Sequence, residues 1–330
     1  MTLRVIAFAV LCAAGVTVFL LGLFSGRHLS AENAAGSPFV SGALQVPHEV
    51  RMVLVGDIML ARAIGKLIAQ RGDPRFPFAA TADVFRSADI AFANLENPLS
   101  ERGVSSGNTY SFRADPRTVE GLAAAGFDAV SVANNHIWDY GEDALSDTLS
   151  LLKENGITPV GGGETYDDAH APKIITRGET RVAFLAYTNA LPLWLGEEEA
   201  VPAVARYSDD ILKADVTHAK KLADVVVVSF HWGEEYATRH NPEQERVAKF
   251  AIDSGATIVV GHHPHVVQEV EEYGGGYIAY SLGNFVFDQN FSPDTKRGLA
   301  LFVTIKNGAL AAVTTRSVAF TDDYQPYFLE

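Results

Sequence analysis

The chain has 330 residues, which is enough for one large or two modest domains with a sizeable hydrophobic core. Hydrophobic residues make up 48% and charged residues 20%, an ordinary balance for a globular protein. The formal net charge of −14 argues against a broad nucleic-acid-binding surface, because such a surface is basic. We therefore expect no nucleic-acid partner.

The N-terminus departs from this average. Residues 5–24 carry no charge and are long enough to cross the hydrocarbon core of a bilayer as a helix. We expect residues 1–25 to be a single-pass membrane anchor, with the globular part outside the cytoplasm, in the periplasm or the extracellular space. A cleaved signal segment that leaves a secreted protein is the alternative, although its apolar region is usually about 7–15 residues long and no clean A-x-A site follows. Residues 26–48 are small, polar and interrupted by proline, which is typical of a linker.

Apolar runs alternate with helical patterns from residue 49 onward. Buried strands are predicted over residues 50–56, 89–95, 127–133, 181–187, 224–230 and 256–261. Helices are predicted over residues 114–126, 143–156 and 241–255, each of which ends at glycine. This alternation predicts an α/β domain over residues 49–330. Strand-like runs over 275–287, 299–305 and 309–320 predict an added antiparallel portion.

Polar side chains recur where the predicted strands end. They come from five segments: Asp57, Glu96, Asn135 with His136, His231, and the cluster of His262, His263 and His265. One such residue alone is usually turn chemistry. The carboxyl ends of strands in an open α/β sheet, however, form a shared ligand-binding edge. Since neutral imidazole is the commonest side-chain metal ligand, the recurrence of these residues favours a metal site.

The ligand types indicate which metal to expect. The single cysteine is Cys12, so the globular part has no thiolate to offer. Mixed carboxylate, amide and imidazole ligands suit Mn, Fe or Zn better than Mg or Ca. We expect one or two divalent ions. Two ions about 3.5–4 Å apart would clamp the attacking and leaving oxygens of a phosphoryl displacement.

Six motifs carry a family resemblance. In chain order, within residues 51–290, they are "GDIMLAR", "NLENPLS", "GFDAVSVANNHIWDYG", "SFHWGEEY", "VVGHHPHVVQ" and "YSLGNFVFD". They resemble the successive motifs of the bacterial capsule-synthesis CapA family, which is also known for poly-γ-glutamate synthesis proteins of the PgsA type. The resemblance implies a calcineurin-like metallophosphatase fold, a four-layer α/β/β/α sandwich with mixed sheets. It also implies membrane attachment and a link to capsular polyglutamate or another envelope polymer.

The same resemblance implies roles for individual residues. Asp57 and His265 would serve a first metal site, Glu96 would bridge, Asn135, His231 and His263 would complete a second site, and His136 would be the general acid. The chain departs from the family pattern twice. The opening D-x-H motif reads Asp57-Ile58-Met59, so one imidazole is absent, and Glu96 replaces an aspartate. We therefore expect one tightly bound ion beside a weak or vacant position.

Three further residues near these motifs leave alternatives open. Arg62 either reaches an anionic substrate from the helix after Asp57 or is a solvated or ion-paired arginine. Glu235 either accepts a hydrogen bond from His231 or is a solvated acid. His262 takes the place of a glycine in the family pattern, so we expect a histidine behind the ligands or on the surface.

Two classes of function follow from these residues. The first is a hydrolase or transferase that acts on a phosphoester or a γ-glutamyl-type bond of an envelope polymer or its precursor. The second is a non-catalytic metal-binding subunit that supports polymer synthesis or export beside other subunits. The intact His136 favours the first class, and the missing imidazole at Met59 favours the second.

Overall fold

The structure, a computed structural model, describes residues 49–191 and 202–329. The predicted anchor (residues 1–25) and linker (residues 26–48) lie outside the described residues, so both stay predictions. Within the described part, none of the helices combines the length and apolar character that crossing a bilayer requires.

The first sheet is mixed and is built around β1, a largely buried strand. Its order is β16-β15-β14-β1-β2-β3-β4; β2, β3 and β4 run parallel to β1, and β14, β15 and β16 alternate in direction. A further strand, β13, pairs in parallel with the end of β1. The bounds are β1 Glu49–Ile58, β2 Ile90–Leu95, β3 Ala129–Ser131, β4 Thr158–Val160, β13 Asn284–Val286, β14 Arg297–Lys306, β15 Ala309–Phe320 and β16 Pro326–Phe328.

The second sheet has a parallel centre with antiparallel edges. Its order is β11-β12-β10-β9-β7-β6, in which β7, β9, β10 and β12 are parallel. The bounds are β6 Lys173–Arg177, β7 Thr180–Thr188, β9 Val225–His231, β10 Ile258–His262, β11 Val270–Tyr273 and β12 Gly276–Ala279. Two short strands, β5 (Gly162–Gly163) and β8 (Ala203–Val204), form a separate antiparallel pair.

The two sheets pack face to face because the central strands of the second sheet are apolar on both sides. Val182, Val225 and Ile258 belong to the core shared with the first sheet, whereas their neighbours Val226 and Val259 face the other way. Phe92 of β2 stacks on Phe184 of β7 with ring centroids 5.2 Å apart, which joins the sheets directly. A near-continuous run of buried Val and Ile is what a parallel strand covered on both faces requires.

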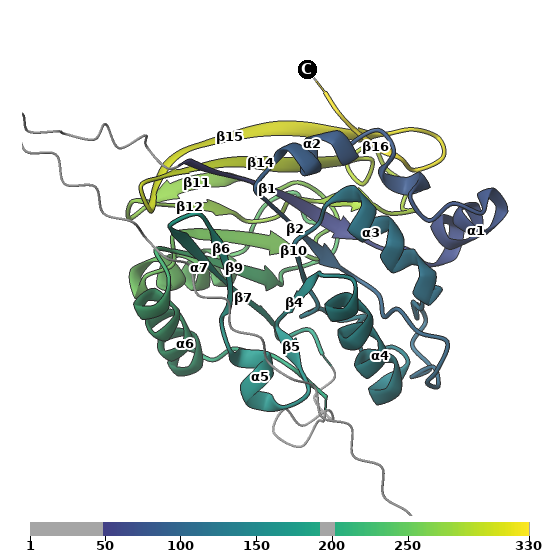
Figure 1. Ribbon diagram of the computed structural model, residues 1–330, viewed down its shortest axis with the longest axis horizontal. Helices are drawn as coiled ribbons and strands as arrows, with labels where there is room; N and C mark the ends of the chain where they lie inside the picture. Colours follow the sequence, from purple (N-terminus) through teal and green to yellow (C-terminus); the bar gives the residue numbers. More distant parts are fainter. Residues whose placement is uncertain (1–48, 192–201, 330) are drawn as a thin grey trace, which may run out of the picture. The chain divides into compact units, whose positions relative to one another are not determined.

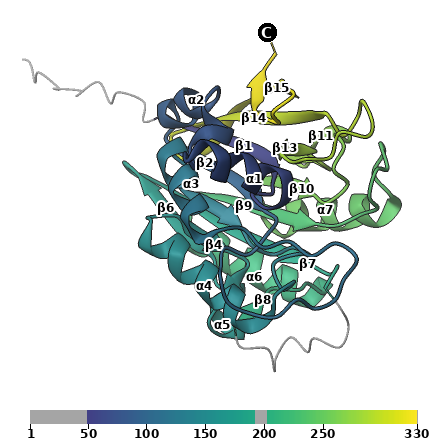
Figure 2. The ribbon, with the colours of Figure 1, turned by 90° about the vertical axis from the view of Figure 1, so that its right-hand side faces the viewer.

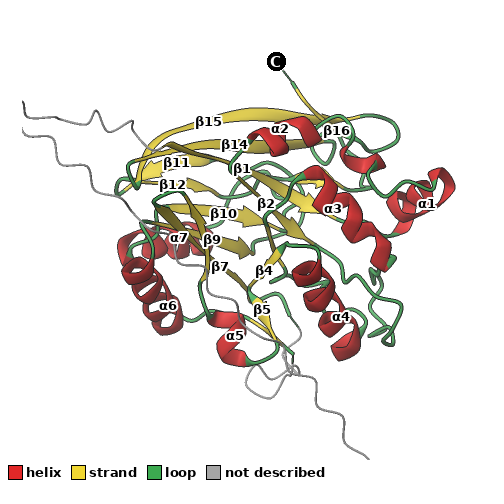
Figure 3. Cartoon of the chain, in the orientation of Figure 1, coloured by secondary structure: helices red, strands yellow, loops and turns green. Residues whose placement is uncertain are grey.

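Helices cover the outer faces. Leu212 of α6 and Val247 of α7 pack on the second sheet, whereas Ile64 of α1, Phe85 of α2 and Leu149 of α4 belong to the core of the first. Figure 1 shows α1, α3 and α4 to the right of the sheets and α6 and α7 to the left, and in Figure 2 α2 and α3 lie on the side away from α7. The bounds are α1 Arg62–Arg71, α2 Ala82–Ser87, α3 Val119–Ala125, α4 Gly141–Glu154, α5 Tyr166–His170, α6 Asp209–Leu222 and α7 Pro242–Ser254, with 3-10 turns at Phe76–Phe78 and Pro116–Thr118. The expected α/β/β/α sandwich of mixed sheets is confirmed (Figure 3).

Two predicted elements are divided in the structure. The run over 275–287 forms β12 in the second sheet and β13 in the first, because the turn at Tyr280–Gly283 carries the chain from one sheet to the other. The helix over 114–126 begins as a 3-10 turn, with Asp115 accepting a hydrogen bond from the Arg117 amide at 2.9 Å, and continues as α3. The six predicted strands and the helices α4 and α7 are confirmed.

One close approach positions the candidate site. A Cβ added to Gly56 would lie 1.8 Å from the carbonyl oxygen of Gly283, so only glycine lets this turn lie against the end of β1. The Asp57 amide then donates to the Gly283 carbonyl at 3.0 Å. The segment after β12 is thereby held beside Asp57.

Candidate metal centre

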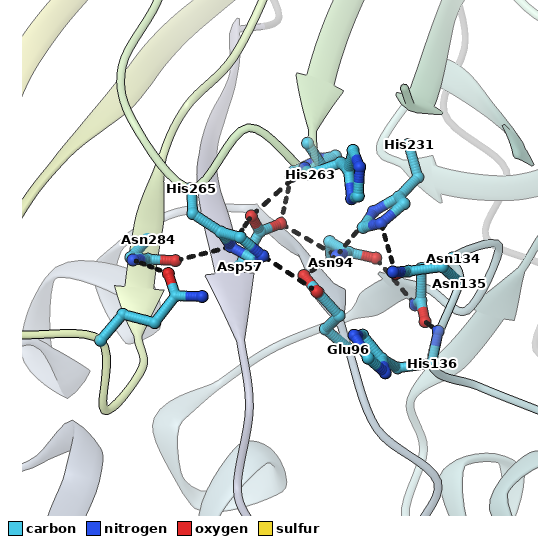
Figure 4. Close-up of polar contacts among 12 residues, drawn as sticks. Asp57, Asn94, Glu96, Asn134, Asn135, His136, His231, His263, His265 and Asn284 are labelled. Carbon is cyan, nitrogen blue, oxygen red and sulfur yellow. Dashed lines mark hydrogen bonds and ion pairs between the residues drawn. The ribbon is translucent and has the colours of Figure 1, made fainter. Parts of the chain in front are cut away.

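The predicted ligands meet at one edge of the molecule, where strands of both sheets end (Figure 4). Each comes from the end of a strand or from the loop that follows it: Asp57 from β1, Glu96 from β2, Asn135 and His136 from β3, His231 from β9, and His263 and His265 from β10. These strands are parallel within each sheet, so their carboxyl ends share an edge. The structure therefore brings together all six residues predicted as metal ligands, with His136 beside them.

Asp57 is fully buried and lies among hydrogen-bond donors. Its Oδ1 lies 3.1 Å from His262 Nδ1, and its Oδ2 lies 3.3 Å from His265 Nδ1. Burial alone would raise the pKa of Asp57, but hydrogen bonds with His262 and His265 outweigh burial and hold that pKa well below its ordinary value. Asp57 is therefore anionic, the form in which a carboxylate can bind a metal ion.

Glu96 is also fully buried, but its environment acts in the opposite direction. Burial, followed by the charge of Asp57, raises the pKa of Glu96 well above its ordinary value. Its Oε1 has no hydrogen-bond partner in the described part of the chain, although His265 Nε2 lies 3.4 Å away. A buried carboxylate oxygen without a donor, close to a second carboxylate, is the arrangement that a bound cation would stabilise.

Asn94, the residue two positions before Glu96, organises both carboxylates. Its Nδ2 donates to Asp57 Oδ1 at 2.9 Å and to Glu96 Oε2 at 3.2 Å, and it lies 3.4 Å from His231 Nδ1. Its Oδ1 accepts a hydrogen bond from Asn134 Nδ2 at 3.1 Å. The sequence contained the signal, since Asn94 opens the NLEN motif, but the spacing alone does not distinguish this amide from a turn residue.

His231 and Asn135 face each other, with His231 Nε2 2.8 Å from Asn135 Oδ1. Burial, together with the nearby His263, lowers the pKa of His231 well below its ordinary value. The imidazole is therefore neutral, which is the form that binds a metal.

His263 and His265 lie on a strained turn after β10. Their φ angles are 96° and 56°, in the left-handed region that residues other than glycine rarely adopt. Burial, followed by the charge of His265, lowers the pKa of His263 to about 4, and His263 Nδ1 is buried without a hydrogen-bond partner among the described residues. His265 Nδ1 is held by Asn284 Oδ1 at 3.0 Å, which directs Nε2 toward Glu96. Backbone strain of this kind gathers at functional sites.

His262 lies behind the predicted ligands rather than on the surface. It is fully buried, and its Nδ1 contacts Asp57 Oδ1. Of the two alternatives from the sequence, the surface position is therefore wrong. A histidine that contacts a ligand carboxylate fixes the orientation of that carboxylate.

His136 is held by an acidic partner. Its Nδ1 lies 2.7 Å from Asp139 Oδ2, and the same oxygen accepts a hydrogen bond from the Phe112 amide at 2.8 Å. The Phe112 ring packs on the imidazole with centroids 4.0 Å apart. These contacts occupy Nδ1 and leave Nε2 as the ring nitrogen available to a substrate.

Arg62 follows the loop after β1, as expected, and is ion-paired. Its Nη2 lies 3.2 Å from Asp288 Oδ1, and its guanidinium carbon lies 5.4 Å from the centroid of the Phe112 ring. The side chain is 40% exposed, so a substrate could still reach it. Its role in substrate binding stays a prediction.

The ligand atoms divide into two groups, in each of which they lie within 4.8 Å of one another. One group is Asp57, Glu96 and His231, and the other is Glu235, His263 and His265. Carboxylates combined with neutral imidazoles fit a divalent ion such as Mn, Fe or Zn. The unpartnered Glu96 Oε1 and His263 Nδ1 support this fit, since no hydrogen bond among the described residues occupies either atom and each could offer a lone pair to a cation.

Comparison with known proteins gives consistent matches. A family model described as bacterial capsule synthesis protein PGA_cap matches residues 51–289. The chain is 34% identical over 268 residues to the capsule biosynthesis protein CapA of Bacillus anthracis, an alignment that covers 79% of this chain and 65% of that protein. It is 34% identical over 257 residues to the PGA biosynthesis protein CapA of Bacillus subtilis (strain 168), covering 77% and 67%. The chain thus spans about two thirds of the length of these relatives.

A solved structure shares the fold. A hypothetical protein from Thermus thermophilus superposes with a TM-score of 0.53 at 17% sequence identity, covering 81% of this chain and 98% of that one. At this identity the likeness concerns the fold alone.

Proposed function

Because the chain belongs to the bacterial capsule synthesis protein family PGA_cap, we propose that it acts in the synthesis or export of capsular poly-γ-glutamate or another envelope polymer, through a metal-dependent hydrolase site. The names of the relatives, capsule biosynthesis and PGA biosynthesis proteins, support the first part of this proposal. The metal centre supports the second part. The substrate would be the polymer or its precursor, cleaved at a phosphoester or a γ-glutamyl-type bond.

One observation supports hydrolysis most strongly. Two buried carboxylates, an amide and three imidazoles converge from five segments, and His136 lies beside them with only one ring nitrogen engaged. A site that only bound a metal for stability would not require a histidine in that position. The ligands would be Asp57, Glu96, Asn135, His231, His263 and His265.

The proposed ligands and His136 have different roles in the reaction. A divalent ion held by these ligands would polarise a phosphoryl or carbonyl oxygen of the substrate and lower the pKa of water. His136 supplies the proton that the leaving oxygen or nitrogen needs as its bond breaks. Asp139 would accept the Nδ1–H hydrogen bond, so in the doubly protonated imidazole Nε2 would carry the proton that is transferred. Phe112 packs on the imidazole and limits its rotation.

The surroundings of the centre suit an anionic, envelope-located substrate. Arg62 offers a guanidinium close to Phe112 and therefore to His136, and a substrate anion would compete with Asp288 for it.

The uncharged N-terminal segment would anchor the protein in the cell membrane with its domain outside the cytoplasm, next to other polymer-synthesis subunits.

A substrate screen tests this function. The full-length protein is purified in detergent, freed of metal with a chelator and reloaded with Mn²⁺, Fe²⁺ or Zn²⁺, then assayed on phosphoesters and γ-linked glutamyl peptides. We expect turnover that disappears on chelation and in His231→Ala. Absence of turnover on both substrate classes with all three metals would contradict the hydrolase proposal.

One observation favours a second candidate, a non-catalytic support subunit. Met59 stands where the family pattern has an imidazole ligand, as expected of a site retained for binding only. This candidate predicts firm metal binding, no turnover, and loss of polymer production in cells when His231 is replaced by alanine. The same screen separates the two candidates.

A further inference from the structure

We propose that Glu235 is a metal ligand, and that with His263 and His265 it forms the second of two ion sites, compensating for the imidazole that is missing at position 59. This inference rests on the proposed function, because it assumes the same metal centre. It revises the expectation of a weak or vacant position. None of the roles considered for Glu235 from the sequence was that of a ligand.

Met59 does not supply the missing ligand. Its side chain is fully buried in the hydrophobic core, and its Sδ accepts a hydrogen bond from the Ala61 amide at 3.2 Å. Its own amide donates to the Val286 carbonyl at 2.8 Å. The residue is therefore engaged in packing, and any replacement ligand must come from another segment.

Glu235 is close enough to take this place. It lies in the loop after β9, four residues beyond His231, and one of its carboxylate oxygens lies within 4.8 Å of nitrogen atoms of both His263 and His265. The other group of Asp57, Glu96 and His231 uses none of these three residues. Two separate sets of three ligands predict two ions rather than one.

The loop that carries Glu235 is fastened to the histidine turn. The Tyr236 amide donates to the Pro264 carbonyl at 2.8 Å, between His263 and His265. Gln268 Nε2 donates to the carbonyl oxygens of Ala237 at 2.8 Å and Arg239 at 3.0 Å, which holds the rest of the loop. Tyr236 keeps a φ of 66° to make this connection. The carboxylate therefore sits on a strained but well-supported backbone, as a ligand requires.

A glycine lets the loop turn toward the histidines. Gly233 has a φ of 84°, and a Cβ added there would lie 2.8 Å from the Gln244 side chain. Gln244 in turn donates through Nε2 to Gln268 Oε1 at 3.0 Å. Gln244 therefore lies against Gly233 at one end of the segment that carries Glu235, and its partner Gln268 bonds the other end at Ala237 and Arg239.

The charges also point to a cation. Glu235 lies in one ligand group, and the buried carboxylates Asp57 and Glu96 lie in the other, so three carboxylates gather in one small region. His263 Nδ1, buried without a partner among the described residues, adds a ring nitrogen that no hydrogen bond occupies. Three carboxylates repel one another in the absence of a cation. A bound cation would remove this repulsion, because the carboxylates would coordinate it.

Counting bound ions tests the assignment without an activity assay. The full-length protein is stripped of metal, titrated with Mn²⁺ by calorimetry, and analysed for metal content after desalting. We expect two equivalents in the unmutated protein. Glu235→Gln, which keeps the shape and removes the charge, should keep one equivalent and bind the second at least about 10-fold more weakly, the lower limit seen when even an outer partner of a metal ligand is lost. The control is Glu234→Gln, at the neighbouring acid, which is exposed as Glu235 is, and this variant should keep both.

The outcomes separate this inference from the proposed function. One equivalent in the unmutated protein, or two equally tight equivalents in Glu235→Gln, would overturn the role of Glu235 while leaving the metal centre in place. Absence of any bound metal in the unmutated protein would overturn both. Should Glu235→Gln fail to fold by circular dichroism, Glu235→Asp keeps the charge on a shorter side chain. The Glu235→Asp variant should bind the second ion more weakly than the unmutated protein does. An unchanged affinity for the second ion would count against the assignment.

Discussion

The pKa values of the two buried carboxylates, Asp57 and Glu96, are shifted in opposite directions by their neighbours. Donors around Asp57 keep it ionised, whereas burial and the charge of Asp57 favour a protonated Glu96 in the absence of a cation. Asn94 links the two through one amide group. A single neutral side chain thus fixes the relative position of both carboxylates.

Replacing Asn94 by alanine should therefore weaken metal binding while leaving every proposed ligand in place. We expect a loss of about 10–100-fold in Mn²⁺ affinity, the range typical of residues that orient ligands. Calorimetric titration measures it, with Asn290→Ala as the control because Asn290 is exposed and lies outside the centre. Equal affinities for the two variants would show that the carboxylates do not depend on Asn94.

Single residues show where sequence reasoning succeeds. The six residues predicted as ligands lie together, as carboxylates, amides and imidazoles that recur at strand ends indicate, and their binding of a metal stays a prediction. Asn94 and Glu235 were not assignable, since their roles depend on which side chains the fold brings to an amide in β2 and to an acid in the loop after β9. The burial of His262 also follows only from the pairing of β9 with β10, in which His231 and His262 are partners.

The loops that carry the ligands are held by the elements around them. Helix α7 begins with a capping box, in which the Asn241 side chain accepts from the Gln244 amide and Gln244 Oε1 accepts from the Asn241 amide. Because Gln244 also contacts Gln268, the start of this helix supports the loop after β9. A helix cap thereby contributes to the geometry of the centre.

Asn241→Ala should lower the free energy of unfolding by about 1 kcal/mol, the usual cost of losing a side-chain N-cap. Urea denaturation measures this change. Asn241→Ser is the matched control, since serine caps helices as well as asparagine does, and it should stay close to the unmutated protein. An unchanged urea midpoint in Asn241→Ala would mean that the capping box does not stabilise the fold.

Element boundaries are predictable where local chemistry decides them. The helix predicted over 241–255 is α7, because proline at its start and glycine at its end act locally. The prediction of one continuous run over 275–287 is wrong, because each half is equally strand-like and the choice of sheet depends on long-range pairing. Local propensity does not specify which sheet a strand joins.

The whole molecule places its metal centre where two sheets end together, so the centre connects them. Asp57 and Glu96 come from the first sheet and His231, His263 and His265 from the second. A bound ion would therefore join both halves of the core and also relieve the repulsion between buried carboxylates. Stability should depend on metal.

Removal of metal should lower the melting temperature. A ligand at 100 times its dissociation constant stabilises the folded state by about 2.7 kcal/mol. For a domain of this size that corresponds to roughly 5–10 °C. Thermal melts followed by circular dichroism, with chelator and with added Mn²⁺, measure the shift. His231→Ala, which keeps the group of Glu235, His263 and His265, should show a smaller shift than the unmutated protein. An unmutated protein that melted at the same temperature under both conditions would count against the centre.

The N-terminal prediction concerns the whole molecule too. The uncharged segment over residues 5–24 should keep the protein in the membrane fraction of its native cells, resistant to high salt and released by detergent. Fractionation with antibody detection checks this. An intact mass that corresponds to a chain beginning near residue 32 would instead indicate a cleaved signal segment.

The most direct measurement compares His136→Ala with His231→Ala for both metal content and turnover. General acid catalysis typically contributes about 10²–10⁴-fold. His136→Ala should lose about that much turnover and keep its metal, whereas His231→Ala should lose turnover together with the ion that Asp57, Glu96 and His231 would hold. The deficit of His136→Ala should be smaller for substrates with nitrophenol-like leaving groups, which depart without a proton. Full activity of His136→Ala on substrates with poor leaving groups would contradict the role of His136 as general acid.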